Sequence, residues 1–144
     1  NNVSVVDLSS NLASPNSVDA VVTFRNLHNW IGPQMDIIFK NSYKALKPGG
    51  IFGIVEHRAN PGTSLDVMKK SGYVTESYAI AIAEKHGFVL VDKSEINANP
   101  KDLKNYERGV WTLPPSLRLK DKDREKYLEI GESDRMTLLF KKPK

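Results

Sequence analysis

The sequence of 144 residues contains no cysteine. Disulfides, thiolate metal ligands and cysteine nucleophiles are therefore excluded, and a reducing cytoplasm is the expected location. The sequence also lacks any apolar run approaching the ~18 residues that span a bilayer, and no charged-then-apolar signal sequence opens it. We expect a soluble cytoplasmic protein that makes no contact with a membrane.

Clusters of one charge sign are also lacking, although the net charge is +4. Basic residues alternate with acidic ones, as in KDLKNYER and LKDKDREKYLE, and the Lys141–Lys144 tail is typical of a solvated end. Nucleic-acid binders gather Lys and Arg on one face with aromatics between them. The pattern therefore predicts no nucleic-acid partner.

Apolar segments of strand length are present and regularly spaced. Val3–Leu8 is a short β-branched run, and residues 18–24, 51–55 and 88–91 are almost continuously apolar. Continuous apolar runs are typical of strands buried on both faces of a parallel sheet. Residues 135–140 form a last candidate strand. The segment between residues 97 and 133 is polar and interrupted by proline.

Two segments have helical period. The first begins at Gly32-Pro33, because proline is favoured in a first helical turn, and ends before Pro48-Gly49-Gly50. The second runs from about residue 74 to His86-Gly87. Alternating strands and helices predict parallel crossovers, and the missing helix before the last strand predicts an antiparallel hairpin. The expected class is α/β, with a mostly parallel sheet and an antiparallel final hairpin.

Three motifs then suggest a family. VDAV at residues 18–21 is followed by the polar loop Asn26-Leu27-His28-Asn29, and LKPGG at residues 46–50 precedes a strand. Asp7-Leu8 lies a dozen residues before the first of these motifs. Together they resemble class I S-adenosylmethionine-dependent methyltransferases, from the third strand of that Rossmann-like fold onward. The late segments Asn99–Asp102 and Ser133–Met136 are similar to bacterial predicted methyltransferases of unassigned substrate.

The resemblance implies a set of cofactor contacts. Asp7 would accept a hydrogen bond from the adenine amino group, or would simply cap a turn at Ser9 or Ser10. The remaining contacts with S-adenosylmethionine would come from Leu8, Phe24, Arg25 and Asn26.

The acceptor side of the site would follow the two central strands. His28 is the candidate general base, or alternatively a structural histidine. Trp30 would wall the acceptor pocket or cover the core. His57 and Arg58 would hold an anionic acceptor, or Arg58 would pair with Glu56 or Asp66. No His and carboxylate residues have helix-spaced metal-ligand geometry, so no metal is expected.

The glycine-rich loop and the ribose-binding carboxylate of this family precede the third strand. We therefore expect residues 1–144 to be a single, incomplete methyltransferase domain that alone binds S-adenosylmethionine poorly and is inactive. The longer protein would methylate a small molecule, with residues 97–133 as a lid or an oligomerisation arm. The alternative is a non-catalytic half-Rossmann module that self-associates as a homo-oligomer through an exposed strand edge.

Overall fold

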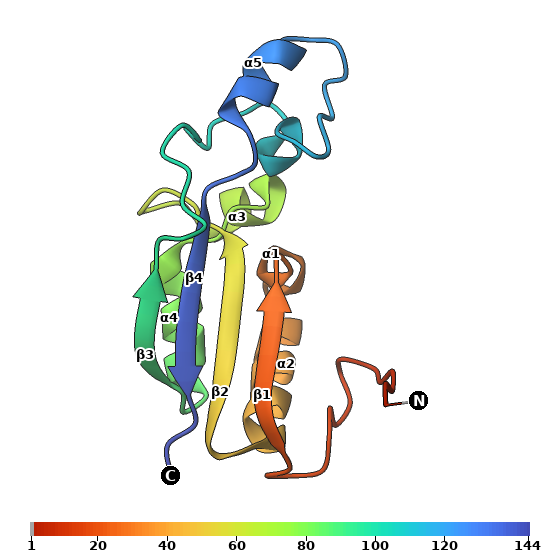
Figure 1. Cartoon of the computed structure of the whole chain (residues 1–144), viewed down its shortest axis with the longest axis vertical. Coiled ribbons are helices and arrows are strands. Elements are labelled where there is room, and N and C mark those ends of the chain that lie inside the picture. Colours follow the sequence, from red (N-terminus) through yellow and green to blue (C-terminus); the bar gives the residue numbers. More distant parts are fainter. Residues whose placement is uncertain (1) are drawn as a thin grey trace.

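A computed structural model describes residues 2–144, which form a four-stranded sheet backed by helices. The strands are β1 (Val18–Phe24), β2 (Leu46–His57), β3 (Val89–Ser94) and β4 (Arg135–Lys141), in the spatial order β1-β2-β4-β3. β1 and β2 pair in parallel, and β4 runs antiparallel to both β2 and β3. β1, β2 and β3 thus point the same way and β4 opposes them (Figure 1). The α/β class and the antiparallel final hairpin are confirmed.

Helices cover one face of this sheet only. α2 (Pro33–Ala45) and α4 (Glu76–Lys85) lie behind the strands in Figure 1, and the front face carries no helix over its middle. α2 buries Met35, Ile38 and Phe39 against the core, as its helical period predicts. The alternate side chains of β2 and β4 that face these helices are also buried, among them Phe52 and Phe140.

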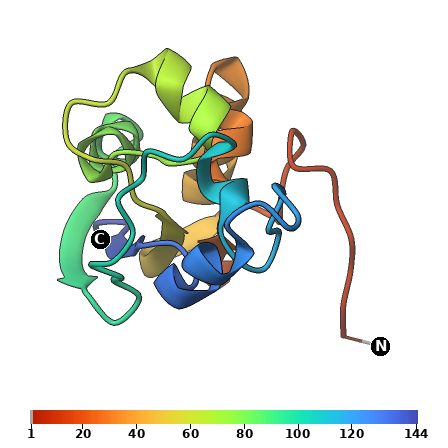
Figure 2. The ribbon, with the colours of Figure 1, turned by 90° about the horizontal axis from the view of Figure 1, so that it is seen from above.

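The carboxyl ends of β1 and β2 meet a separate layer of short elements. α1 (Leu27–Trp30) follows β1 directly, and α3 (Leu65–Ser71) follows β2 after a loop. Residues 97–133, which we call the cap segment, contain the 3₁₀ helix η1 (Gly109–Thr112) and α5 (Arg124–Ile130). In Figures 1 and 2 the cap segment lies above this end of the sheet.

Three local expectations need correction. Residues 3–8 are not part of the sheet of the described residues, which consists of β1, β2, β4 and β3. The Lys47–Gly50 turn lies inside β2, where the pairing jumps from Val18–Leu46 to Ala20–Ile51. α3 is a helix in addition to the two that the sequence predicts; Ser64 caps its start and Gly72 ends it in the left-handed region, at φ 77°.

The uncovered face of the sheet is apolar. Val22 and Phe24 on β1 are 56% and 57% exposed, and Ile51 on β2 is 40% exposed. These side chains border a cavity of ≈ 370 Å³ that crosses to β4 at Leu139. No helix formed by the described residues is long and apolar enough to cross a bilayer.

Candidate functional site

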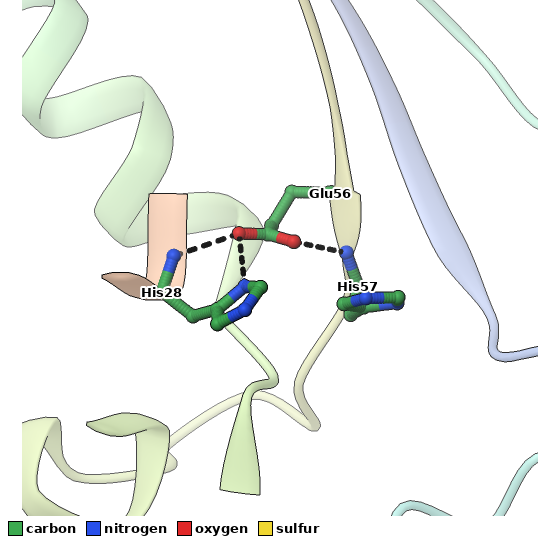
Figure 3. A group of neighbouring side chains, drawn as sticks. All are labelled: His28, Glu56 and His57. Atoms are coloured by element: carbon green, nitrogen blue, oxygen red, sulfur yellow. Dashed lines mark hydrogen bonds and ion pairs between the residues drawn. The ribbon is translucent and has the colours of Figure 1, made fainter. Parts of the chain in front are cut away.

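His28, Glu56 and His57 meet where β1 and β2 end (Figure 3). Glu56 is the penultimate residue of β2 and its side chain is fully buried. Its Oε2 accepts hydrogen bonds from the backbone N–H of His28, at 2.8 Å, and from Nδ1 of His28, at 3.0 Å. Its Oε1 accepts the backbone N–H of His57 at 2.8 Å. The carboxylate therefore holds the ends of the two strands in register.

Local structure explains why Glu56 is needed there. The first N–H groups of a helix lack partners inside the helix, and a capping side chain usually accepts one of them. The N-cap residue of α1, Asn26, makes no such bond. Glu56 takes this role from the neighbouring strand, and the same contact brings its carboxylate to the His28 ring.

The tautomer of His28 follows from these bonds. Both Glu56 oxygens accept backbone N–H groups, so the carboxylate acts as an acceptor and Nδ1 of His28 is the donor. When the ring is neutral, Nε2 of His28 keeps a free lone pair. A carboxylate that orients a histidine in this way is a recurring arrangement in general base catalysis.

His57 lies beside His28, with 5.6 Å between the ring centroids. Its Nδ1 is within hydrogen-bond distance of Ser133 Oγ, which also accepts the Nε–H of Arg135 at 3.2 Å. Burial first, and then the charges of His28, Arg135 and Arg25, lower the pKa of His57 to about 3. His57 is therefore neutral near pH 7.

Both histidines line a cavity of ≈ 320 Å³ between the strand ends and the cap segment, which we call the histidine pocket. Its walls combine the residue after β1 with residues from α1, β2, the cap segment and β4: Arg25, His28, Asn29, His57, Val110, Trp111, Pro114, Pro115, Ser116 and Arg135. The rings of Trp111 and His28 pack edge-to-face, with 5.8 Å between their centroids. A pocket with a few convergent polar groups is the usual form of a small-molecule site.

The same three side chains are the described residues that could hold a metal ion. His28, Glu56 and His57 offer ligand atoms within 4.8 Å of one another. However, both carboxylate oxygens and the Nδ1 atoms of both rings already have protein partners. Hydrogen bonding is therefore the use that this geometry supports best.

Arg58 points away from the histidine pocket into an ion-pair network. Its Nε and Nη2 donate to the two Asp134 oxygens, each at 3.0 Å, and Nη2 also donates to Glu95 at 2.7 Å. Glu56 and Asp66, the partners expected from the sequence, are not used. Burial alone would raise the pKa of Asp134, but hydrogen bonds from Arg58 and Lys104 outweigh it and hold that pKa at about 2. The network joins the cap segment to the end of β2.

The residues expected to bind the cofactor are divided between two cavities and an exposed loop. Leu8, Phe24 and Asn26 line a separate cavity of ≈ 280 Å³ at the outer edge of β1, together with Trp30. Arg25 lines the histidine pocket instead. Asp7 is exposed on a loop, where hydrogen bonds from the hydroxyl and from the backbone N–H of Ser9 lower its pKa. Trp30 also belongs to the core, with 9% of its surface exposed.

These residues do not by themselves fit S-adenosylmethionine. The β1-edge cavity, at ≈ 280 Å³, is at the lower limit of roughly 300 Å³ for ligand pockets, and apolar side chains predominate in its lining. The ribose diol and the methionyl group require polar partners at close range. Thr23 Oγ1 is buried there without a hydrogen-bond partner, but a single hydroxyl does not supply them. Residues 2–144 thus provide at most one wall of a donor site.

Comparison with known proteins identifies the fold. No protein-family model matches the sequence, and no curated protein is significantly similar to it. Among solved structures, the chain superposes on a SAM-dependent methyltransferase from Methanosarcina mazei with a TM-score of 0.60 and 16% identity, covering 97% of this chain and 66% of that one. The fold is that of class I S-adenosylmethionine-dependent methyltransferases.

Two further neighbours show how widely this fold is used. Phosphoethanolamine N-methyltransferase 2 from Haemonchus contortus, solved with S-adenosylmethionine, gives a TM-score of 0.59 at 20% identity over 96% of this chain and 36% of that one. The [4+2]-cyclase SpnF gives 0.62 at 17% identity over 97% of this chain and 55% of that one. The chain thus spans less than two thirds of the length of each of these neighbours.

Proposed function

We propose that this chain forms the acceptor-binding part of an S-adenosylmethionine-dependent methyltransferase that acts on a small molecule. The fold supports the reaction class, and the phosphoethanolamine enzyme among the neighbours is named for a small acceptor. The observation that carries the proposal is the hydrogen bond between Glu56 Oε2 and His28 Nδ1 inside the histidine pocket. It prepares a base at the sheet edge where open α/β folds bind their substrates.

The chemistry of the acceptor side follows from this bond. An acceptor hydroxyl or amine in the histidine pocket would lose its proton to Nε2 of His28. The buried Glu56 carboxylate would stabilise the imidazolium that results, and the backbone bonds to Glu56 would prevent the ring from turning. The oxygen or nitrogen left behind is the nucleophile that methyl transfer requires. The cap segment would exclude water from this exchange.

The methyl donor needs residues beyond those described here. We infer that the 144-residue chain alone binds S-adenosylmethionine weakly, because its donor-side cavity is small and apolar. Activity would therefore belong to the full-length protein that contains this sequence.

The test measures methyl transfer from S-adenosylmethionine to a panel of small hydroxy and amino compounds by that full-length protein. We expect His28→Gln to lower turnover about 100-fold or more, the ordinary contribution of a general base. His86→Gln is the matched control, because His86 ends α4 and bonds Asp36, outside the pocket. No transfer to any acceptor, or equal turnover for the two variants, would overturn the proposal. Micromolar binding of S-adenosylmethionine to the 144-residue chain by calorimetry would separately refute the inference about the donor side.

A second candidate function is self-association through the uncovered face of the sheet. Three large side chains, Val22, Phe24 and Ile51, are exposed there beside an open strand edge at β1. Exposed apolar patches rimmed by polar residues commonly mark protein interfaces. The occupant that we propose for this face is a second copy of the chain, and the Discussion gives its test.

A further inference from the structure

The histidine pocket has an unusual charge. Arg25 and Arg135 both line it, and none of its lining residues is acidic. Glu56 lies behind His28, where its two oxygens accept three N–H groups, and Glu132 pairs with Arg135. The interior that a ligand would meet is therefore positive.

The two arginines differ in how far they are neutralised. Arg135 donates from Nη2 to Glu132 at 3.2 Å. For Arg25, in contrast, no acidic partner occurs among residues 2–144. Arg25 also adopts φ 58°, a left-handed conformation that is costly for a residue with a side chain and that clusters at ligand sites. Among residues 2–144, Arg25 is therefore the cation of the pocket that is left without a carboxylate partner.

His57 adds a hydrogen-bond donor. Ser133 Oγ accepts from Arg135, and we assign its own hydroxyl hydrogen to the contact with Nδ1 of His57. A neutral His57 that accepts at Nδ1 carries its proton on Nε2. Arg25, Arg135 and His57 thus offer donors, whereas Nε2 of His28 is the acceptor described above.

The cap side of the lining is largely apolar. Val110, Trp111 and the Pro114-Pro115 pair form the cap-side wall. A bare inorganic anion would leave this wall without contacts, whereas an organic body would cover it.

We propose that the histidine pocket binds a small organic monocarboxylate that also carries a hydroxyl or amino group. Its carboxylate lies against Arg25, Arg135 and Nε2–H of His57, and its hydroxyl or amine faces His28. This assignment rests on the proposed function, of which it names the acceptor class. The unpaired Arg25 guanidinium matches a carboxylate, and the donors and the one acceptor match the two ends of such a molecule.

The test compares two probes of the same shape, 4-hydroxybenzoate and 4-hydroxybenzamide, by calorimetry and by the NMR shift of the Trp111 indole. The carboxylate is expected to bind at least tenfold more tightly than the amide, since hydrogen bonds to charged groups each contribute that order of affinity. Arg25→Gln and Arg135→Gln should each reduce this ratio about tenfold or abolish it. Arg124→Gln, on the exposed side of α5, is the matched control and should leave it unchanged. Thermal midpoints confirm that each variant is folded.

Equal affinity for the two probes, absence of binding by the carboxylate, or a ratio unaffected by both arginine substitutions would overturn the proposal. Failure of the carboxylate site can be distinguished from failure of the proposed methyltransferase function. Carboxylate binding without methyl transfer refutes the methyltransferase proposal alone. Methyl transfer to neutral acceptors, with no preference for carboxylates, refutes the anion site alone.

Discussion

At the scale of single residues, Glu56 shows how one side chain can serve structure and chemistry together. Its carboxylate caps α1 by accepting the backbone N–H of His28, and it also accepts the backbone N–H of His57. A third bond, from Nδ1 of His28, orients the His28 ring. Three hydrogen bonds to a fully buried carboxylate leave no oxygen unpaired. The cost of burying the charge is offset only while all three bonds persist.

His57 gives a prediction at the same scale. An unfolded histidine takes up a proton near pH 6.5, whereas His57 in the folded chain does so only near pH 3. The unfolded state therefore binds more protons between these values, and acid favours unfolding. We expect the free energy of unfolding to fall by up to about 1.4 kcal/mol per pH unit between pH 6 and 5, measured by urea titration.

The control for this prediction is the pair of glutamine variants. His57→Gln should flatten the slope between pH 6 and 5, and His86→Gln should keep the contribution of His57. Identical slopes for the native protein and His57→Gln would show that His57 is not the group responsible. The window lies above the ordinary pKa of Asp134, so that carboxyl contributes its own acid sensitivity only at lower pH.

At the scale of elements, the cap segment depends on a close contact between η1 and α3. Gly109 has φ 58°, and a Cβ added to it would lie 2.4 Å from the carbonyl oxygen of Ser71. To relieve this contact the backbone of α3 would have to move, which costs more than a side-chain rearrangement. We predict that Gly109→Ala destabilises the chain by about 2–5 kcal/mol, from left-handed strain and overpacking together.

Gly62→Ala separates the two causes. Gly62 has φ 83°, but no atom lies within 4 Å of an added Cβ, so this variant should lose only about 1–2 kcal/mol. Urea unfolding gives both values, and limited proteolysis should show earlier cleavage in residues 97–133 for Gly109→Ala. Equal losses for the two variants would mean that the η1–α3 contact is not tight.

The elements also show what could be predicted from sequence. The strands at residues 18–24 and 135–140 and the helix after Gly32-Pro33 followed from local apolar period and turn residues, and the structure confirms them. Residues 3–8 have the same β-branched pattern but lie outside the four strands of the described residues, since strand formation depends on tertiary context that a local pattern does not reveal.

The candidate site was only partly predictable for a related reason. His28, His57 and Arg25 follow strands, and the rule that sites lie at strand ends was enough to select them. The Glu56–His28 bond and the contributions of Trp111 and Arg135 join positions far apart in the sequence. A charged residue ending the apolar run at 51–55 was the one available signal for Glu56.

At the scale of the whole molecule, the one-sided covering of the sheet leads to the last prediction. We expect the chain to form a homodimer in solution, measured by light scattering, because a second copy would cover the exposed side chains of β1 and β2. Val22→Lys should convert the dimer to a monomer, because it places a charge on the uncovered face. Ile37→Lys, at an exposed position of α2 on the opposite side, should leave the mass unchanged. A monomer at high concentration would contradict the prediction.

The position of β4 has a consequence for how the molecule is made. β4 is the last strand in the chain but lies between β2 and β3. During synthesis β3 leaves the ribosome before residues 135–141 exist, and at that stage it has no hydrogen-bonded neighbour. Arg135 also reaches the histidine pocket only once β4 has inserted. The sheet and the pocket are therefore completed in one late step, and a nascent chain stalled before β4 would expose two strand edges to its surroundings.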